Sequence, residues 1–200
     1  MQKYIELKKK NYLTVILTGI IISVLVLSIT AFADTFGGKR TLNSDGYVEI
    51  CPAGSIAAAE GYTDMFNNAV NKWSNISSNM KGILSIDDIL KENIDIAYLD
   101  DTSTSGLLGT CVLYKKFLGF TVSASPDDNW LYARTFFYEN QMDAYNMTNA
   151  QKTANMVHEL GHLQKLAHPT TTQTSIMNQG IQSIGVTTYD KSEIKSKWGN

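Results

Sequence analysis

All three histidines of the chain lie within eleven residues, in the run H-E-L-G-H-L-Q-K-L-A-H, which contains His158, Glu159, His162 and His168. Residues four apart on an α-helix differ by about 40° around the axis and about 6 Å along it, so the imidazoles of His158 and His162 can bind one metal ion. A catalytic zinc ion has three protein ligands, which can all be imidazoles, and it keeps a fourth position open for water. Glu159 would stand beside that water as its general base. The sequence therefore predicts hydrolysis by a zinc-activated water.

His168 can reach the same ion only if the helix ends soon after His162. In a continuous helix, His168 would lie about 15 Å from the first histidine along the axis. Pro169 disfavours the helical conformation at the residue before it. We therefore expect a turn after His162 and assign His168 as the third ligand. A helix that continued would leave Asp190 or Glu193 as the third ligand.

The histidine run and the later segment Ser175-Ile176-Met177-Asn178 resemble the metzincin clan of zinc endopeptidases, and within it the matrixin-like proteases that bacteria secrete. The resemblance covers residues 47–200. It implies that His158, His162 and His168 bind one catalytic zinc ion, that Glu159 is the general base, and that Met177 forms the Met-turn under the metal. It also implies an α+β fold with a twisted mixed five-stranded sheet, a long active-site helix, a Met-turn and a C-terminal helix.

One position departs from the family's pattern. The family usually has Gly three residues after the second histidine, where it takes the left-handed conformation that ends the helix, but this chain has Lys165. A residue other than Gly in that conformation costs on the order of 1 kcal/mol. On this reasoning, we expect Lys165→Gly to be tolerated.

Residues 1–33 have the pattern of a secretory signal peptide. Four lysines precede an apolar run over residues 13–29, and Ala31-Phe32-Ala33 reads as a signal-peptidase site before Asp34. The sequence therefore predicts a secreted, extracellular protein, and the family resemblance implies a bacterial one. The alternative is an uncleaved segment that anchors the protein at the cell surface, which is the only arrangement in which we expect a membrane partner.

Removal of the leader makes the chain more acidic. It takes away four of the 17 basic and one of the 19 acidic residues, which changes the formal charge from −2 to about −5. No basic run remains that would favour nucleic acid. We expect residues 34–46 to form a short N-terminal extension and residues 47–200 to form the protease-like domain, which acts as a monomer.

Two cysteines, Cys51 and Cys111, lie in the predicted exported part. An even number in an oxidising compartment favours one disulfide between them. The alternative, by resemblance to the matrixin propeptide, is that Cys51 occupies the zinc ion as an inhibitory thiolate. Cys51-Pro52-Ala53-Gly54 lacks the motif of that propeptide.

Hydrophobic periodicity and capping residues predict alternating helices and strands without repeats. A helix is expected after Thr63 as N-cap, with Phe66, Ala69, Val70 and Trp73 on its buried face. Thr148 and Gln151 predict a capping box and a helix from Asn149, and Asp190 is the expected cap of a helix over residues 191–198. Strands are expected near residues 48–50, 94–98, 109–114, 117–122 and 130–138.

Further roles follow from the resemblance. Matrixin-like enzymes hold peptides against an edge strand, and Gly106-Leu107-Leu108-Gly109 resembles the segment that leads into it. Tyr189 is a candidate for stabilising the oxyanion. A structural calcium site is a further candidate, with its ligands among Asp100, Asp101, Asp127 and Asp128.

The sequence thus favours a secreted zinc metalloendopeptidase acting on protein or peptide substrates. A membrane-anchored surface peptidase is the first alternative. A non-catalytic, zinc-stabilised binding module is the second, but such a module would have no use for the Glu159 carboxylate.

Overall fold

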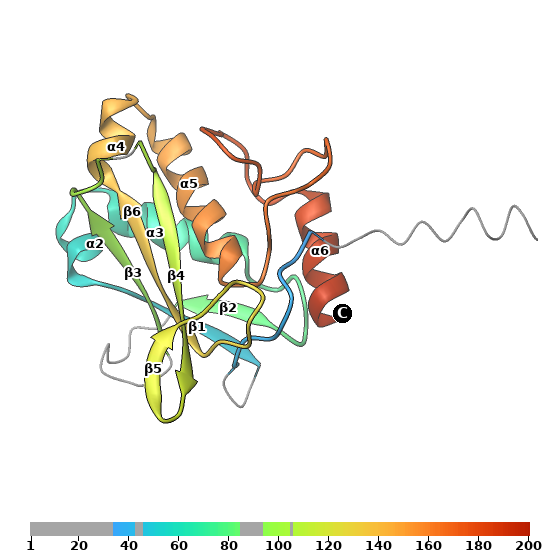
Figure 1. Ribbon diagram of the computed structural model, residues 1–200. Coiled ribbons are helices and arrows are strands. Elements are labelled where there is room, and N and C mark those ends of the chain that lie inside the picture. Colours follow the sequence, from blue (N-terminus) through green and yellow to red (C-terminus); the bar gives the residue numbers. More distant parts are fainter. Residues whose placement is uncertain (1–33, 43–45, 85–93, 105) are drawn as a thin grey trace, which may run out of the picture. The chain divides into compact units, whose positions relative to one another are not determined.

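A mixed six-stranded sheet lies at the centre of the computed structural model, which describes residues 34–42, 46–84, 94–104 and 106–200 (Figure 1). The strand order is β2-β1-β3-β6-β4-β5. Neighbours among β2, β1, β3 and β6 are parallel, whereas β4 is antiparallel to both β6 and β5. The strands are β1 (Tyr47–Pro52), β2 (Lys81–Leu84), β3 (Asp95–Asp100), β4 (Gly109–Phe117), β5 (Phe120–Ser123) and β6 (Tyr132–Tyr138). The predicted α+β class with a mixed sheet is confirmed.

The predicted number of five strands is wrong, because the sequence pattern does not indicate β2. This strand has only four residues, and they pair in register with Tyr47–Ile50 of β1. The predicted break after residue 114 is also absent. β4 continues to Phe117, and the turn into β5 falls at Leu118 and Gly119, which both have positive φ angles.

Five α-helices lie among the described residues, and two of them cover one face of the sheet. α3 and α5 pack against each other and against the sheet. The Trp73 indole donates a hydrogen bond of 2.8 Å to the Val157 carbonyl, and the rings of Phe66 and Phe137 lie 6.4 Å apart. α5 is thereby fixed between α3 and the strands β4 and β6. The helices are α2 (Gly54–Ala58), α3 (Tyr62–Lys72), α4 (Glu139–Ala144), α5 (Asn149–His162) and α6 (Thr188–Trp198).

The caps of two helices differ from the prediction. The capping box of α5 between Thr148 and Gln151 is present as predicted. The N-cap of α3 is Gly61, so that Thr63 lies inside the helix. α6 begins earlier than predicted, after Thr187, and Asp190 is the third helical residue of its capping box.

Residues 34–42 pack within the compact unit Ala33–Asn200. The Phe36 amide donates to the Lys165 carbonyl at 2.8 Å, and the Ala167 amide donates to the Asp34 carbonyl at 2.8 Å. The Arg40 guanidinium forms a buried ion pair of 2.8 Å with Asp95. These contacts make the first part of the predicted extension an integral part of the fold.

The predicted disulfide between Cys51 and Cys111 is absent from the structure. β3 and β6 lie between β1, which carries Cys51, and β4, which carries Cys111. Three strand spacings amount to about 14 Å. A disulfide joins Cα atoms no more than about 7 Å apart, so the strand order prevents this bond.

The predicted signal peptide and membrane anchor lie outside the described residues. No helix in the described part of the chain is both long enough and apolar enough to span a bilayer.

Candidate metal centre

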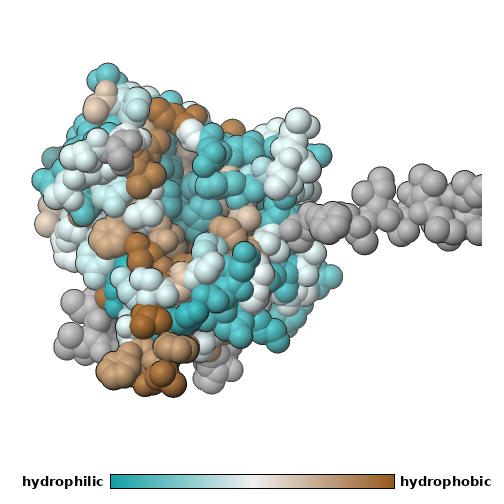
Figure 2. Space-filling model, in the orientation of Figure 1, coloured by the Kyte–Doolittle hydropathy of each residue, from teal (hydrophilic) through white to brown (hydrophobic). Residues whose placement is uncertain are grey.

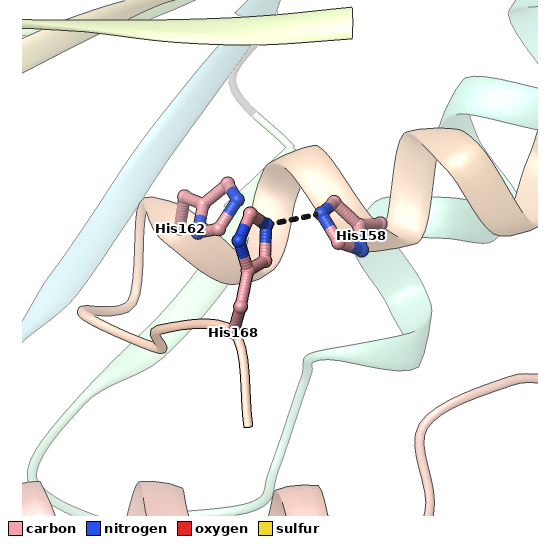
Figure 3. Close-up of side chains that lie close together, drawn as sticks. All are labelled: His158, His162 and His168. Carbon is pink, nitrogen blue, oxygen red and sulfur yellow. Dashed lines mark hydrogen bonds between the residues drawn. The ribbon is translucent and has the colours of Figure 1, made fainter. Parts of the chain in front are cut away.

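Three imidazoles meet at the C-terminal end of α5 (Figure 3). His158 and His162 lie on successive turns of the helix, and His168 comes from the segment that returns after it. One ring nitrogen from each lies within 4.8 Å of the others, and the Nε2 atoms of His158 and His168 are 3.1 Å apart. Among the described residues, no other group of three His, Cys, Asp or Glu side chains comes together in this way. The structure thus brings the three predicted ligands together without Asp190 or Glu193.

Backbone carbonyls fix the orientation of two of these imidazoles. Nδ1 of His158 lies 2.8 Å from the Ile176 carbonyl, and Nδ1 of His162 lies 2.8 Å from the Leu166 carbonyl. A carbonyl oxygen can only accept, so each Nδ1 carries the proton and each Nε2 keeps its lone pair. Donation of the second ring N–H to a carbonyl is the usual support for a metal-binding histidine.

The chain reverses direction directly after α5, as the third ligand requires. The Leu166 amide donates to the Gly161 carbonyl, and the Lys165 amide donates to the His162 carbonyl, at 3.2 and 3.0 Å. These two bonds define a Schellman motif in which Lys165, with φ of 70°, takes the left-handed position. The expected turn is therefore present, with a lysine where Gly is the usual residue.

The side chain of Lys165 is fully buried and binds three backbone carbonyls. Nζ donates to Gly37, Pro126 and Asp128 at 2.9, 2.8 and 2.7 Å, and it lies 5.0 Å from the centre of the Trp130 ring. Burial lowers the pKa of Lys165 to about 8, so the side chain is still mainly protonated at pH 7. Lys165 therefore forms the turn after α5 and also joins the N-terminal segment to the loop before β6.

The predicted Met-turn lies against the end of α5 and is held by α6. The Asp190 carboxylate accepts hydrogen bonds from the Ser175 hydroxyl and from the Ile176 amide, the latter at 3.1 Å. The Ile176 carbonyl is the one that orients His158. A Cβ atom at Gly161 would overlap the Met177 sulfur, so only Gly lets Met177 pack there. Asp190 is thus a support of the site and not one of its ligands.

Glu159 lies beside the histidines in a cleft of about 430 Å³. The cleft is bounded on one side by residues 106–111 and on the other by residues 179–182. The Glu159 side chain touches the backbone of Gly109, where a Cβ atom would lie 2.6 Å from Cγ of Glu159. The predicted segment from Gly106 to Gly109 is therefore next to the predicted general base. Asn155 holds this segment in place, because the Asn155 side-chain amide donates a hydrogen bond of 3.1 Å to the Leu108 carbonyl.

Burial keeps the imidazoles neutral. It lowers the pKa of His158 to about 4 and that of His162 to about 3, and it also lowers the pKa of His168. Burial raises the pKa of Glu159 to about 8. A cation held by the three rings would favour the ionised carboxylate. Neutral imidazoles are the form that binds metals, so the site is prepared for a cation.

The N-terminal segment supports the third ligand, a role that the sequence does not reveal. Asp34 accepts a hydrogen bond of 2.8 Å from the Thr170 hydroxyl, and its carbonyl accepts from the Ala167 amide at 2.8 Å. These two residues lie on either side of His168. The Phe36 ring lies 5.8 Å from the His162 ring. The only sequence signal for this segment is its position directly after the predicted leader.

Two further sequence hypotheses do not match the structure, and a third stays a prediction. Cys51 is buried in β1 and does not line the cleft, so it is not placed to bind a metal there. The Tyr189 hydroxyl donates to the Asp34 carboxylate, and Tyr189 does not line the cleft. A structural calcium site stays a prediction, although Asp100, Asp101, Asp127 and Asp128 do not form a group of three side chains around one point. Asp128 instead pairs with Lys115 at 2.6 Å.

The donor set fits a zinc ion. Three neutral imidazoles provide the nitrogen ligands that a borderline-soft cation prefers, and Glu159 lies next to them without belonging to the cluster. The chain matches no protein-family model and no curated protein. The resemblance to the metzincins therefore rests on the motif residues themselves.

Proposed function

We propose that the protein is a zinc-dependent endopeptidase of metzincin type in which His158, His162 and His168 hold the metal and Glu159 is the general base. The observation that carries this proposal is the convergence of the three rings on one side of a cleft that also contains Glu159. A structural zinc site would complete the coordination with a fourth protein ligand. The described residues offer no fourth His, Cys, Asp or Glu to the cluster.

When bound, zinc would acidify a water molecule and polarise the carbonyl of the scissile peptide bond. Glu159 would accept the proton of the attacking water and deliver it to the departing amine. Its position against the Gly109 backbone limits its movement, so the carboxylate stays next to the cleft. His158 and His162 are held by the Ile176 and Leu166 carbonyls and need no reorganisation to bind the ion.

The cleft suits an extended peptide. On the side of β4 away from β6, β5 pairs only with Tyr114–Phe117, and no described strand pairs there with residues 109–112. A peptide could add to this edge through main-chain hydrogen bonds, which depend little on its sequence. The other wall, residues 179–182, would contact the side chains next to the cleaved bond. We therefore propose polypeptides as the substrate class. We also propose that the protein reaches these substrates by secretion, after removal of the leader.

Hydrolysis of casein by purified residues 34–200 tests the proposal, because Ala33–Asn200 is a compact unit of its own. We expect cleavage that a chelator abolishes. Glu159→Ala should keep the fold and the zinc but lose activity by several orders of magnitude. If Glu159→Ala cleaved casein as fast as the parent protein, the proposed general base would be wrong.

A further inference from the structure

The two walls of the cleft are held in different ways. The first wall, residues 106–111, leads into β4 and lies beside β6. Its Leu108 carbonyl accepts hydrogen bonds from the Tyr138 amide at 2.9 Å and from the Asn155 side chain at 3.1 Å. The second wall, residues 179–182, lies between the Met-turn and α6 in a segment without helix or strand. The sheet thus fixes only the first wall.

The segment 179–186, which contains the second wall, has few contacts of its own. Figure 2 shows mainly hydrophilic surface, teal and white, where Figure 1 places the chain between α5 and α6. Ile181 and Ile184 are 41% and 37% exposed, so they do not anchor the segment by apolar packing. Val186, which is next to α6, packs against the core. The backbone groups of residues 179–186 form no hydrogen bond within the described part of the chain.

Gln182 is the anchor of this segment. Its side-chain amide donates to the Ile176 carbonyl at 3.0 Å and to the Asn178 carbonyl, so both amide hydrogens are used. Among the described residues, these are the only hydrogen bonds that residues 179–186 form. The Gln182 side chain is half-buried and lines the cleft. One side chain therefore ties the second wall to the Met-turn.

The carbonyl that Gln182 binds also orients one of the imidazoles. The Ile176 carbonyl lies 2.8 Å from Nδ1 of His158, so it accepts from both His158 and Gln182. A carbonyl oxygen has two lone pairs, and these two bonds use both of them. The Ile176 amide is held in turn by the Asp190 carboxylate at 3.1 Å. Gln182 thus fixes the second wall to the residue that orients His158, and with it the distance between this wall and the metal centre.

We propose that Gln182 is a positioning residue, which holds the second wall in place and so determines how well the cleft binds the side chain after the cleaved bond. Residues 179–181 line the cleft and are exposed, so they meet the substrate, whereas Gln182 makes the attachment. The role in specificity rests on the proposed hydrolysis. The attachment is a property of the fold and can be measured without a substrate.

Backbone dynamics test the attachment without any catalysis. In ¹⁵N relaxation of purified residues 34–200, the amides of residues 179–186 should have order parameters of about 0.8 or higher. Gln182→Met has a similar length but no donor, and it should lower these values below about 0.6. Gln182→Glu should do the same, because a carboxylate cannot donate to two carbonyls. Gln173→Met is the matched control and should change nothing, because Gln173 is exposed and lies outside the cleft.

Two peptides test the consequence for specificity. They differ only in the residue after the cleaved bond, which is leucine in one peptide and glycine in the other. The parent protein should cleave the leucine peptide at least about tenfold more efficiently, because a side chain that fills the cleft adds binding energy. Gln182→Met should lower kcat/KM for the leucine peptide by about tenfold, mainly through KM. It should change the value for the glycine peptide by less than about twofold and leave zinc affinity unchanged.

Order parameters that Gln182→Met left unchanged would overturn the proposal, because another contact would then hold the wall. An equal loss of kcat/KM for both peptides, together with weaker zinc binding, would also overturn it and would make Gln182 a support of the metal site alone. A parent protein that cleaved neither peptide would contradict the proposed hydrolysis, and the order parameters would still decide whether Gln182 holds the wall.

Discussion

Replacement of Lys165 distinguishes two roles of this residue. One is its left-handed backbone conformation in the turn after α5, and the other is the binding of carbonyl groups by its buried side chain. If its left-handed conformation were its main effect, Lys165→Gly would relieve about 1 kcal/mol of strain and stabilise the protein. The structure instead shows a buried ammonium group that binds three carbonyls from Gly37, Pro126 and Asp128. We therefore expect Lys165→Gly to destabilise the protein, contrary to the sequence-based expectation.

The magnitude follows from the contacts. Lys165→Gly leaves three buried carbonyls without a partner, at roughly 2 kcal/mol each, and relief of the desolvation that lowers the pKa of Lys165 offsets more than half of this sum, which leaves about 2 kcal/mol. The four buried methylene groups add about 3 kcal/mol. After relief of the strain, Lys165→Gly should lower the free energy of unfolding by about 4 kcal/mol. Lys165→Met, which keeps most of the apolar stem, should lower it by about 2 kcal/mol.

Urea unfolding of residues 34–200 with and without zinc measures these differences. Both variants should also bind zinc more weakly than the parent protein, because the turn that carries His168 loses its link to the N-terminal segment. A Lys165→Gly variant as stable as the parent protein, with the same zinc affinity, would refute the reasoning. It would show that the three carbonyl bonds contribute no net stability.

Three further predictions concern the site and its supports. Gly109→Ala should displace the Glu159 carboxylate and lower kcat at least a hundredfold with little change in zinc content, which casein assays and metal analysis can check. Asp190→Ala should free the segment that orients His158 and weaken zinc binding by 10- to 100-fold in a competition titration with a chelator. Burial lowers the pKa of Lys165 from 10.5 to about 8, so the unfolded chain binds more protons between these pH values. The free energy of unfolding should therefore gain an increment as pH rises through this window, and Lys165→Met should lack it.

The sequence predicts the ligands of the site well because their geometry is local. The spacing of His158 and His162 requires only a helix, and the capping box of Thr148 and Gln151 that begins this helix depends on neighbours three residues apart. The supports could not be predicted in the same way. Lys165 and Asp34 act through partners more than 35 and 130 residues away, respectively, and no local pattern encodes such contacts.

The errors in the fold have the same origin. β2 is a strand only because it pairs with β1, and the chain between Lys81 and Leu84 is too short for a periodic pattern. The type I′ turn at Leu118 escaped prediction because Leu is a poor residue for it. The disulfide depended on the order of strands in the sheet, which the number of cysteines does not determine.

Reconstitution with zinc tests the central claim most directly. Residues 34–200 are stripped of metal with a chelator and titrated with Zn²⁺ while casein hydrolysis is followed, with Glu159→Gln measured beside the parent protein. We predict that activity rises linearly to one zinc ion per chain, and that Glu159→Gln binds the same single ion without gaining activity. Zinc binding by the parent protein without hydrolysis, or hydrolysis that needs no zinc, would contradict the account.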